Sequence, residues 1–108
     1  MPRLKSQQFK ELFRAGQRVS LKGGLLVIYK ENSFGANRLG FVIPKKAAKL
    51  STVRNRTKRL LREAYRINKH NIKEGFDMII YAYNPLKSLP EAEKLVLDVL
   101  SKAKLIKK

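Results

Sequence analysis

The sequence has no cysteine, no tryptophan and one histidine, and only 8 of its 108 residues are acidic. Without cysteine there is no disulfide, no thiol nucleophile and no zinc–thiolate site. The acids are scattered, with none of the D-x-D, H-x-H or H-E-x-x-H spacings of a metal centre. The longest apolar runs, residues 25–29 and 78–83, have the length of strands rather than of membrane spans. These absences argue against a protein that carries its own hydrolytic machinery.

Positive charge is what the sequence has in excess. It holds 25 Lys and Arg, a net charge of +17, and 44% hydrophobic residues, which is enough for a core. We therefore expect one folded domain over residues 1–108 whose partner is a polyanion. Nucleic acid is favoured over an anionic membrane, because no amphipathic segment with large lipid-facing residues is present. Residues 1–10 contain no apolar signal region, so we expect a cytoplasmic protein without a membrane partner.

Periodicity predicts seven elements in the order α-β-β-β-α-β-α. Ser6 is expected to cap the first helix, Ser51 or Thr52 the second, and Ser88 the third, with Gly16 ending the first. The predicted strands are residues 18–21, 25–30, 38–43 and 76–83. The second helix is expected to run to about Lys69. The third helix has an apolar stripe of Ala92, Leu95, Val96, Val99, Leu100 and Ala103. The pattern predicts an α+β sandwich with helices on a four-stranded sheet.

The second predicted helix carries the most informative charge pattern. Ten basic residues lie between positions 45 and 69, and Glu63 is the only acid among them. At about 100° per residue, an arc of about 140° holds the polar residues Arg54, Asn55, Lys58, Arg59, Arg62, Arg66 and Lys69, with Arg56 at its edge. Val53, Leu60, Ala64 and Ile67 are expected to face the sheet. So few acids leave the arc without i,i+4 partners, which favours polyanion binding over a merely solvated face.

The order of residues in this helix adds a specific signal. The run Val53-Arg54-Asn55-Arg56-Thr57-Lys58-Arg59-Leu60-Leu61-Arg62-Glu63-Ala64-Tyr65 resembles the RNR motif of the bacterial ribonuclease P protein subunit. The likeness extends to Phe9-Lys10-Glu11-Leu12-Phe13 with Gly16, to Leu39-Gly40-Phe41-Val42-Ile43-Pro44-Lys45-Lys46, and to Gly75-Phe76-Asp77-Met78-Ile79-Ile80.

The resemblance implies an RNA-binding cofactor of the enzyme that removes the 5′ leader from precursor tRNA. Its expected partners are a catalytic RNA, one protein per RNA, and the precursor tRNA. Hydrolysis would be performed by the RNA with Mg²⁺ bound mainly by RNA, so no protein residue is catalytic. The implied fold contains a left-handed βαβ crossover, as in the fold of ribosomal protein S5 domain 2. Physical rules alone favour a right-handed crossover.

The resemblance also implies two binding surfaces. Carried over by motif position, Arg54, Asn55, Arg56, Lys58, Arg59, Arg62 and Arg66 would contact the catalytic RNA. A cleft between the first helix and the sheet would hold single-stranded leader by stacking on Phe9, Phe13, Val27, Tyr29 and Val42, with Lys45 and Lys46 attracting phosphates. Both phenylalanines and Val27 also suit an ordinary core.

Two alternative functions stay open on the sequence. A ribosomal-type RNA binder would share the size and charge but has no reason to carry the arginine run. A DNA-binding architectural protein would prefer duplexes.

Asn55 could help to hold a metal ion, although one amide is not a cage. His70 is interpreted as a cation at a helix end rather than as a chemical group.

Overall fold

The computed structural model describes residues 3–21 and 24–107. The elements follow the predicted order: α1 (Ser6–Ala15), β1 (Gln17–Ser20), β2 (Leu25–Glu31), β3 (Arg38–Val42), α2 (Ser51–Asn68), the 3-10 turn η1 (Lys69–Asn71), β4 (Phe76–Ala82) and α3 (Leu89–Lys102). Two of the three expected caps are wrong. Ser6 and Ser51 are the first helical residues, with Lys5 and Leu50 before them. The third is confirmed, since Ser88 Oγ accepts a hydrogen bond from the Glu91 amide at 3.3 Å.

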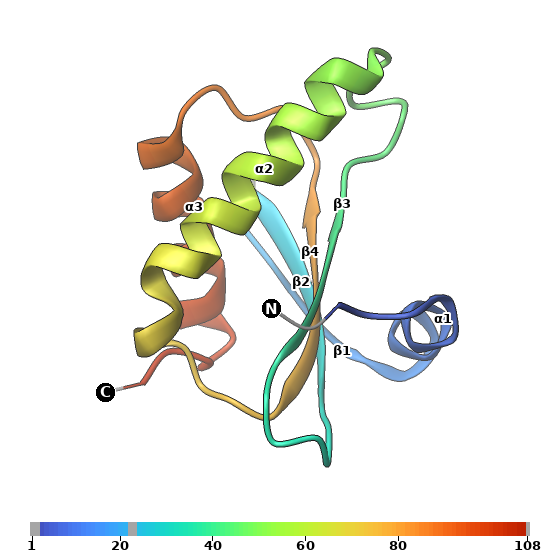
Figure 1. Cartoon of the computed structure of the whole chain (residues 1–108), viewed down its shortest axis with the longest axis vertical. Helices are drawn as coiled ribbons and strands as arrows, with labels where there is room; N and C mark the ends of the chain where they lie inside the picture. The colour runs from blue at the N-terminus through green and yellow to red at the C-terminus, as the bar shows by residue number, and fades with distance from the viewer. Residues whose placement is uncertain (1–2, 22–23, 108) are drawn as a thin grey trace.

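The four strands form one sheet in the order β1-β2-β4-β3. β4 is antiparallel to β2 and parallel to β3, so the last strand in sequence lies inside the sheet. The parallel pair is joined through α2, and this β3–α2–β4 connection is the left-handed crossover that the resemblance implies (Figure 1).

Helices cover the two faces of the sheet unequally. α2 and α3 lie together on one face, while α1 lies beside only one end of the other (Figure 1). Register assigns the side chains to these faces, because neighbouring partners across a sheet point the same way. Val27, Ile80 and Phe41 form a row toward α2 and α3, and Ile28, Ile79 and Gly40 form a row toward α1.

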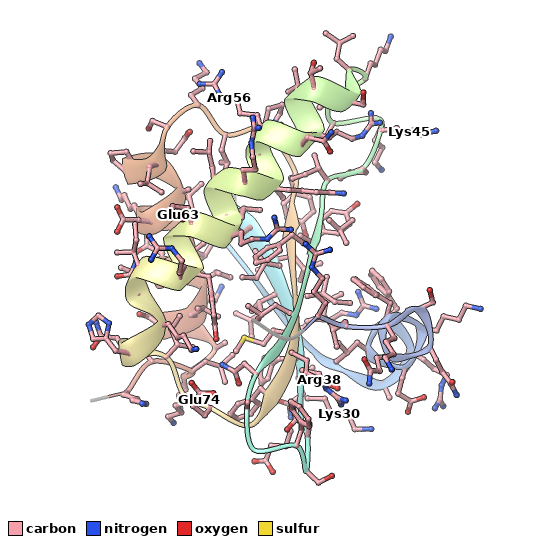
Figure 2. The ribbon with its side chains drawn as sticks, viewed as in Figure 1. Lys30, Arg38, Lys45, Arg56, Glu63 and Glu74 are labelled. Carbon is pink, nitrogen blue, oxygen red and sulfur yellow. The ribbon has the colours of Figure 1, made fainter. Side chains whose placement is uncertain are left out.

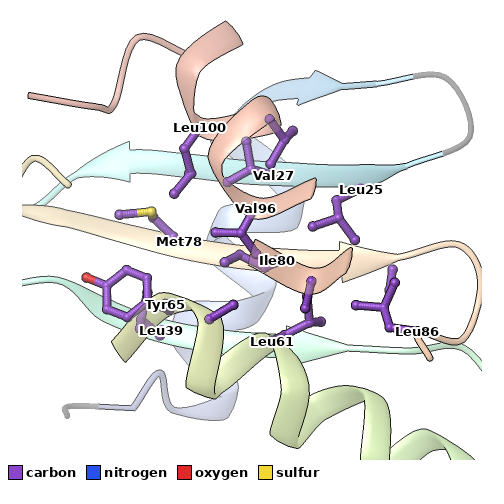
Figure 3. Packing of buried hydrophobic residues seen from close by; sticks show 14 of the residues in the cluster. Leu25, Val27, Leu39, Leu61, Tyr65, Met78, Ile80, Leu86, Val96 and Leu100 are labelled. Atoms are coloured by element: carbon purple, nitrogen blue, oxygen red, sulfur yellow. The ribbon is translucent and has the colours of Figure 1, made fainter. Parts of the chain in front are cut away.

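The main core lies between the sheet and the pair α2 and α3 (Figure 3). It includes Leu61 and Tyr65 of α2 and Val96 and Leu100 of α3, all at most 1% exposed. A second, smaller core of Leu4, Leu12, Ile28 and Ile79 holds α1. The predicted apolar stripe of α3 is confirmed, although Leu95 is only partly covered.

The face of α2 that meets the sheet differs from the prediction. Its buried residues are Thr57, Leu61, Ala64 and Tyr65, whereas Ile67 is 38% exposed and Leu60 and Val53 are half-buried. Thr57 and Tyr65 can be buried because their hydroxyls have partners: Thr57 Oγ1 accepts from the Leu86 amide at 3.1 Å, and the Tyr65 hydroxyl from Asn37 Nδ2 at 2.8 Å. Relative to the prediction, the helix is turned by about 75°.

Asn37 fixes α2 against the start of the crossover strands. Besides Tyr65, its Nδ2 donates to the Lys73 carbonyl at 2.8 Å, and its Oδ1 accepts from the Phe76 amide at 2.9 Å. The side chain is only 4% exposed. One buried amide therefore links the start of β3, the end of α2 and the start of β4. Within the part of the chain that the structure describes, no helix is long and apolar enough to span a bilayer.

Candidate nucleic-acid interface

The rotation of α2 divides the polar side chains of its basic arc into two groups. Arg54, Lys58 and Arg62 are half-buried and follow the side of the helix next to β3, whereas Asn55, Arg59 and Arg66 are exposed. Together these six residues are called the basic ridge below. Arg56 lies on the other side of the helix from Lys45 (Figure 2). The predicted RNA-contacting residues are thus all at the surface, on two adjoining sides of one helix.

Two arginines of the RNR run also hold loops in place. Arg54 Nη1 donates to the carbonyls of Ala48 and Lys49 at 2.8 and 2.9 Å, which fixes the loop between β3 and α2. Arg56 Nη2 donates to the Lys87 carbonyl at 2.9 Å, in the loop before α3. Substituting either residue would therefore change local structure as well as charge.

Arg66 differs from the rest of the basic ridge because it pairs with the acid of the motif. Its Nε donates to Glu63 Oε2 at 3.0 Å. The hydrogen bond from Arg66, helped by its charge, lowers the pKa of Glu63. In the described residues no ion pair involves Arg54, Lys58, Arg59 or Arg62, so these four cations keep their charge available for a partner.

A groove of about 450 Å³ crosses the β3 edge between α2 and α1. Its cationic wall is made by Lys58 and Arg62 with Arg3 of the N-terminal segment, and its floor by Phe9, Gly40 and Phe41. The Arg62 guanidinium carbon lies 5.8 Å from the centre of the Phe41 ring, a cation–π contact. The groove thus connects the ridge on α2 with the α1 face of the sheet.

The α1 face has an uncovered row of side chains beyond the end of α1. Register places Ser20, Leu26, Tyr81 and Val42 in this row. Phe9, Leu26 and Val42 each pack against the small core that holds α1. Phe13 is 40% exposed, and the Arg18 guanidinium carbon lies 5.9 Å from its ring centre. The resemblance implies a cleft on this side of the sheet, and we therefore call Phe9, Phe13, Leu26, Val42 and Tyr81 the sheet cleft.

Two residues expected in the sheet cleft lie elsewhere. Val27 is fully buried and faces α2 and α3, and Tyr29 faces the same side, edge-on to Phe76 at 6.2 Å between ring centres. In β2 the side chains that face α1 are those of Leu26 and Ile28. The prediction that Val27 and Tyr29 face α1 is therefore wrong. Phe9 and Val42 do lie on the expected face, where both pack against the small core, and Phe13 lies on the same helix as Phe9.

Sequence reasoning missed Tyr81, Leu26, Arg18 and Arg3. Tyr81 packs edge-on against Tyr83 with 5.4 Å between ring centres. The alternation of Asp77, Ile79, Tyr81 and Tyr83 in the last strand was a signal that could have identified this pair. Arg3 had no such signal, because its position depends on the Arg3–Leu39 bridge and the 3.0 Å hydrogen bond from the Leu4 amide to the Leu39 carbonyl.

Lys45 and Lys46 are exposed in the turn that follows β3, at the Val42 end of the sheet cleft. Asn55 is also exposed. Among residues 3–21 and 24–107, no three His, Asp or Glu side chains come together to hold a metal ion. Asp77 instead accepts hydrogen bonds from Arg38 at 2.7 and 2.9 Å and from Asn32 at 2.9 Å. The two surfaces thus offer mainly cations and aromatic rings.

Basic α+β sandwiches with an arginine-rich helix and an aromatic-lined sheet face form a class of small proteins suited to nucleic acid. The family model described as Ribonuclease P matches residues 3–104. The chain therefore belongs to the ribonuclease P protein family.

Individual relatives agree with this assignment. The ribonuclease P protein component of Alkaliphilus oremlandii is 40% identical over 105 residues, covering 94% of this chain and 90% of the relative. That of Clostridium botulinum strain 657 is 38% identical over 103 residues, covering 92% and 90%. Among solved structures, the RNase P proteins of Staphylococcus aureus and Thermotoga maritima are 26% and 27% identical, each with a TM-score of 0.82, covering 94% of this chain and 94% and 97% of theirs.

Proposed function

We propose that this chain is the protein subunit of a ribonuclease P that removes the 5′ leader from precursor tRNA, acting in the cytoplasm as one protein per catalytic RNA. The observation that carries the proposal is the match to the family over residues 3–104, together with a basic ridge in which four cations form no ion pair with a described acid. The chain would serve the reaction by binding and orienting RNA.

The basic ridge is the proposed contact with the catalytic RNA. Arginine forks bind phosphate oxygens in pairs and stack on bases, so Arg59 and Arg62 suit a folded RNA surface. Arg54 and Arg56 would contribute charge while keeping the flanking loops in place. Lys58 and Arg62 also face the groove, so RNA bound to the ridge would extend to the β3 edge.

The sheet cleft is the proposed site for the single-stranded leader. Tyr81, Phe13 and Phe9 offer ring faces, and Arg18, Lys45 and Lys46 supply positive charge around them. Stacking of bases on aromatic side chains tolerates sequence variation, which suits a subunit that meets many leaders. Tyr81 takes the place in this proposal that the sequence argument gave to Tyr29.

Mg²⁺ is assigned mainly to the RNA. Three described acids or histidines do not meet anywhere, and the exposed amide of Asn55 would at most add one oxygen ligand to an ion already held by phosphates. When bound, the ion would supply an activated water and stabilise the charge that develops on the phosphate. The protein's contribution is to reduce phosphate repulsion and to hold the leader.

Reconstitution tests the proposal. The chain is added to a bacterial ribonuclease P RNA at low Mg²⁺, and cleavage of precursor tRNA is compared with that by the RNA alone. We expect faster cleavage with the chain, and a smaller gain with the double variant Arg59→Ala/Arg62→Ala, which removes two cations of the basic ridge. Lys94→Gln, an exposed lysine on α3, is the control and should behave like the wild type.

The same experiment separates the alternative function. A structural RNA-binding protein of ribosomal type would bind the RNA without increasing cleavage. That result would overturn the proposed role in leader removal while leaving the ridge as an RNA contact.

A further inference from the structure

The C-terminal end of α3 has a lysine where helices usually place glycine. The Leu105 amide donates to the Leu100 carbonyl at 2.9 Å and the Lys104 amide to the Ser101 carbonyl at 3.0 Å. These two bonds form a Schellman motif, whose central residue adopts a left-handed backbone and is most often glycine. Here that residue is Lys104, with φ of 62°, the one non-glycine positive φ in the described chain. A lysine at this position costs stability that glycine would not.

Two other lysines join Lys104 around a surface hollow. Lys73, Lys104 and Lys107 line a volume of about 740 Å³ together with Ser101 and Ile106. These three lysines are called the lysine hollow.

Main-chain pairing fixes the backbone that carries the lysine hollow. The Lys73 amide donates to the Leu105 carbonyl and the Lys107 amide to the Asn71 carbonyl, both at 2.7 Å. Ile72 and Ile106 form an antiparallel bridge between them, with Ile72 fully buried. The lysines therefore project from a docked segment rather than from a free tail.

Among residues 3–21 and 24–107, no acid lines the lysine hollow and no ion pair involves its lysines. Glu74, the neighbour of Lys73, has a carboxylate oxygen 3.3 Å from the Asn37 amide, which donates to it. Three cations therefore share a concave surface without a described counter-charge, at a cost in self-repulsion that a bound anion would relieve.

We propose that the lysine hollow is a second phosphate-binding surface for the catalytic RNA. This inference rests on the proposed function. The hollow is lined by residues that follow α2 and end α3, and both helices cover the face of the sheet opposite α1, to which the leader is assigned (Figure 1). α2, at 18 residues, spans about 27 Å and leads through η1 to Lys73, so the hollow is placed to contact a different RNA segment from the one at Arg54. Lysine ammonium groups bind phosphate as point charges, which suits positioning without base readout.

Substitution of Lys104 separates stability from binding. Lys104→Gly removes the charge and the left-handed strain together, so we expect a melting temperature a few degrees higher. We also expect the slope of log affinity against log salt for a bacterial ribonuclease P RNA to become shallower by about 1, with binding roughly threefold to tenfold weaker near 0.1 M salt. Lys104→Arg keeps the charge and should keep the slope.

Further variants and a second probe complete the test. Lys73→Gln/Lys107→Gln should reduce the slope by about 2 without touching the left-handed residue, and Lys94→Gln should leave it unchanged. A wild-type slope in Lys104→Gly and in the double variant overturns this inference alone. Loss of binding to phosphatidylserine vesicles with unchanged RNA binding overturns it in favour of a membrane surface. If the wild-type chain binds no RNA, the proposed function and this inference both fall.

Discussion

A single glycine, Gly40, determines how closely α1 approaches the sheet. A Cβ atom built on Gly40 would overlap Cζ of Phe9, so the ring lies directly on the backbone of β3. The Phe9 ring cannot withdraw freely, because it also packs against the small core of Leu4, Leu12, Ile28 and Ile79. The shape of the groove and the sheet cleft therefore depends on the absence of one methyl group.

We expect Gly40→Ala to lower the free energy of unfolding by about 1–3 kcal/mol, the usual cost of overpacking. Urea denaturation followed by circular dichroism measures it. Gly24→Ala is the control, because the nearest atoms to its added Cβ lie at 3.4 Å, an ordinary contact. Equal stabilities of the two variants would show that Phe9 can move aside.

Tyrosines on opposite faces of the sheet give a second test at the level of residues. Tyr81 lies in the uncovered row of the α1 face, whereas Tyr29 faces α2 and α3. We expect Tyr81→Ala to weaken binding of precursor tRNA to the assembled enzyme by about 1–3 kcal/mol, the value of one base stacked on an aromatic ring. Binding of mature tRNA, which has no leader, should not change.

Tyr29→Ala is the matched control and should not discriminate precursor from mature tRNA. Equal losses for both RNAs in Tyr81→Ala, or a precursor-specific loss in Tyr29→Ala, would contradict the assignment of the leader to the sheet cleft. Equilibrium binding at fixed salt is the measurement.

Among the elements, α2 depends on the buried pair of Tyr65 and Asn37. Burial raises the pKa of the Tyr65 hydroxyl, while the hydrogen bond from Asn37 acts in the opposite direction. The folded state thus holds this proton more tightly than the unfolded state. Its contribution to stability is complete below the ordinary tyrosine pKa of about 10 and is lost as pH rises through the folded-state pKa.

We expect Tyr65→Phe to lose about 1 kcal/mol at neutral pH, because Asn37 loses one hydrogen-bond partner. Above about pH 10 the difference from the wild type should shrink, since the variant has no hydroxyl to ionise. Urea denaturation between about pH 7 and 11 measures both effects. Tyr83→Phe, at a 42% exposed position, is the control. A difference that stays constant with pH would contradict the prediction.

The order of the elements could be predicted from the sequence, because each one has its own periodicity and turn residues. The rotation of α2 could not be predicted, because the sequence does not show that the hydroxyls of Thr57 and Tyr65 have buried hydrogen-bond partners. Those partners, Leu86 and Asn37, belong to other parts of the chain. The sheet cleft was only partly predictable. Strand alternation divides β2 into two sets, but only pairing with β4 and packing of α1 decide which set faces the cleft.

For the molecule as a whole, the net charge of +17 is confined within a radius of gyration of 12.8 Å. Most of the ion pairs between described residues are on the surface and contribute little. Added salt should therefore weaken the repulsion among the excess cations more than the attraction within these ion pairs. The Debye length at 0.1 M salt, about 10 Å, is shorter than the molecule, so repulsion between distant cations is screened.

We expect the melting temperature to rise by about 4–8 °C, equivalent to about 1 kcal/mol, between 0.02 and 0.5 M sodium chloride. Thermal unfolding followed by circular dichroism measures it, with sucrose at equal osmolality as a control for non-ionic effects. A melting temperature that falls with salt would show that attractive pairs outweigh the net repulsion.

The position of β4 between β2 and β3 has a consequence for synthesis of the chain. Only β1 and β2 can pair before Phe76 leaves the ribosome, because both other pairings use β4. The arginine-rich segment of α2 therefore emerges while the sheet that should support it is incomplete. During that interval the arginine-rich segment lacks the sheet that positions its side chains. The arrangement of cations described for the basic ridge therefore exists only once the last strand is in place.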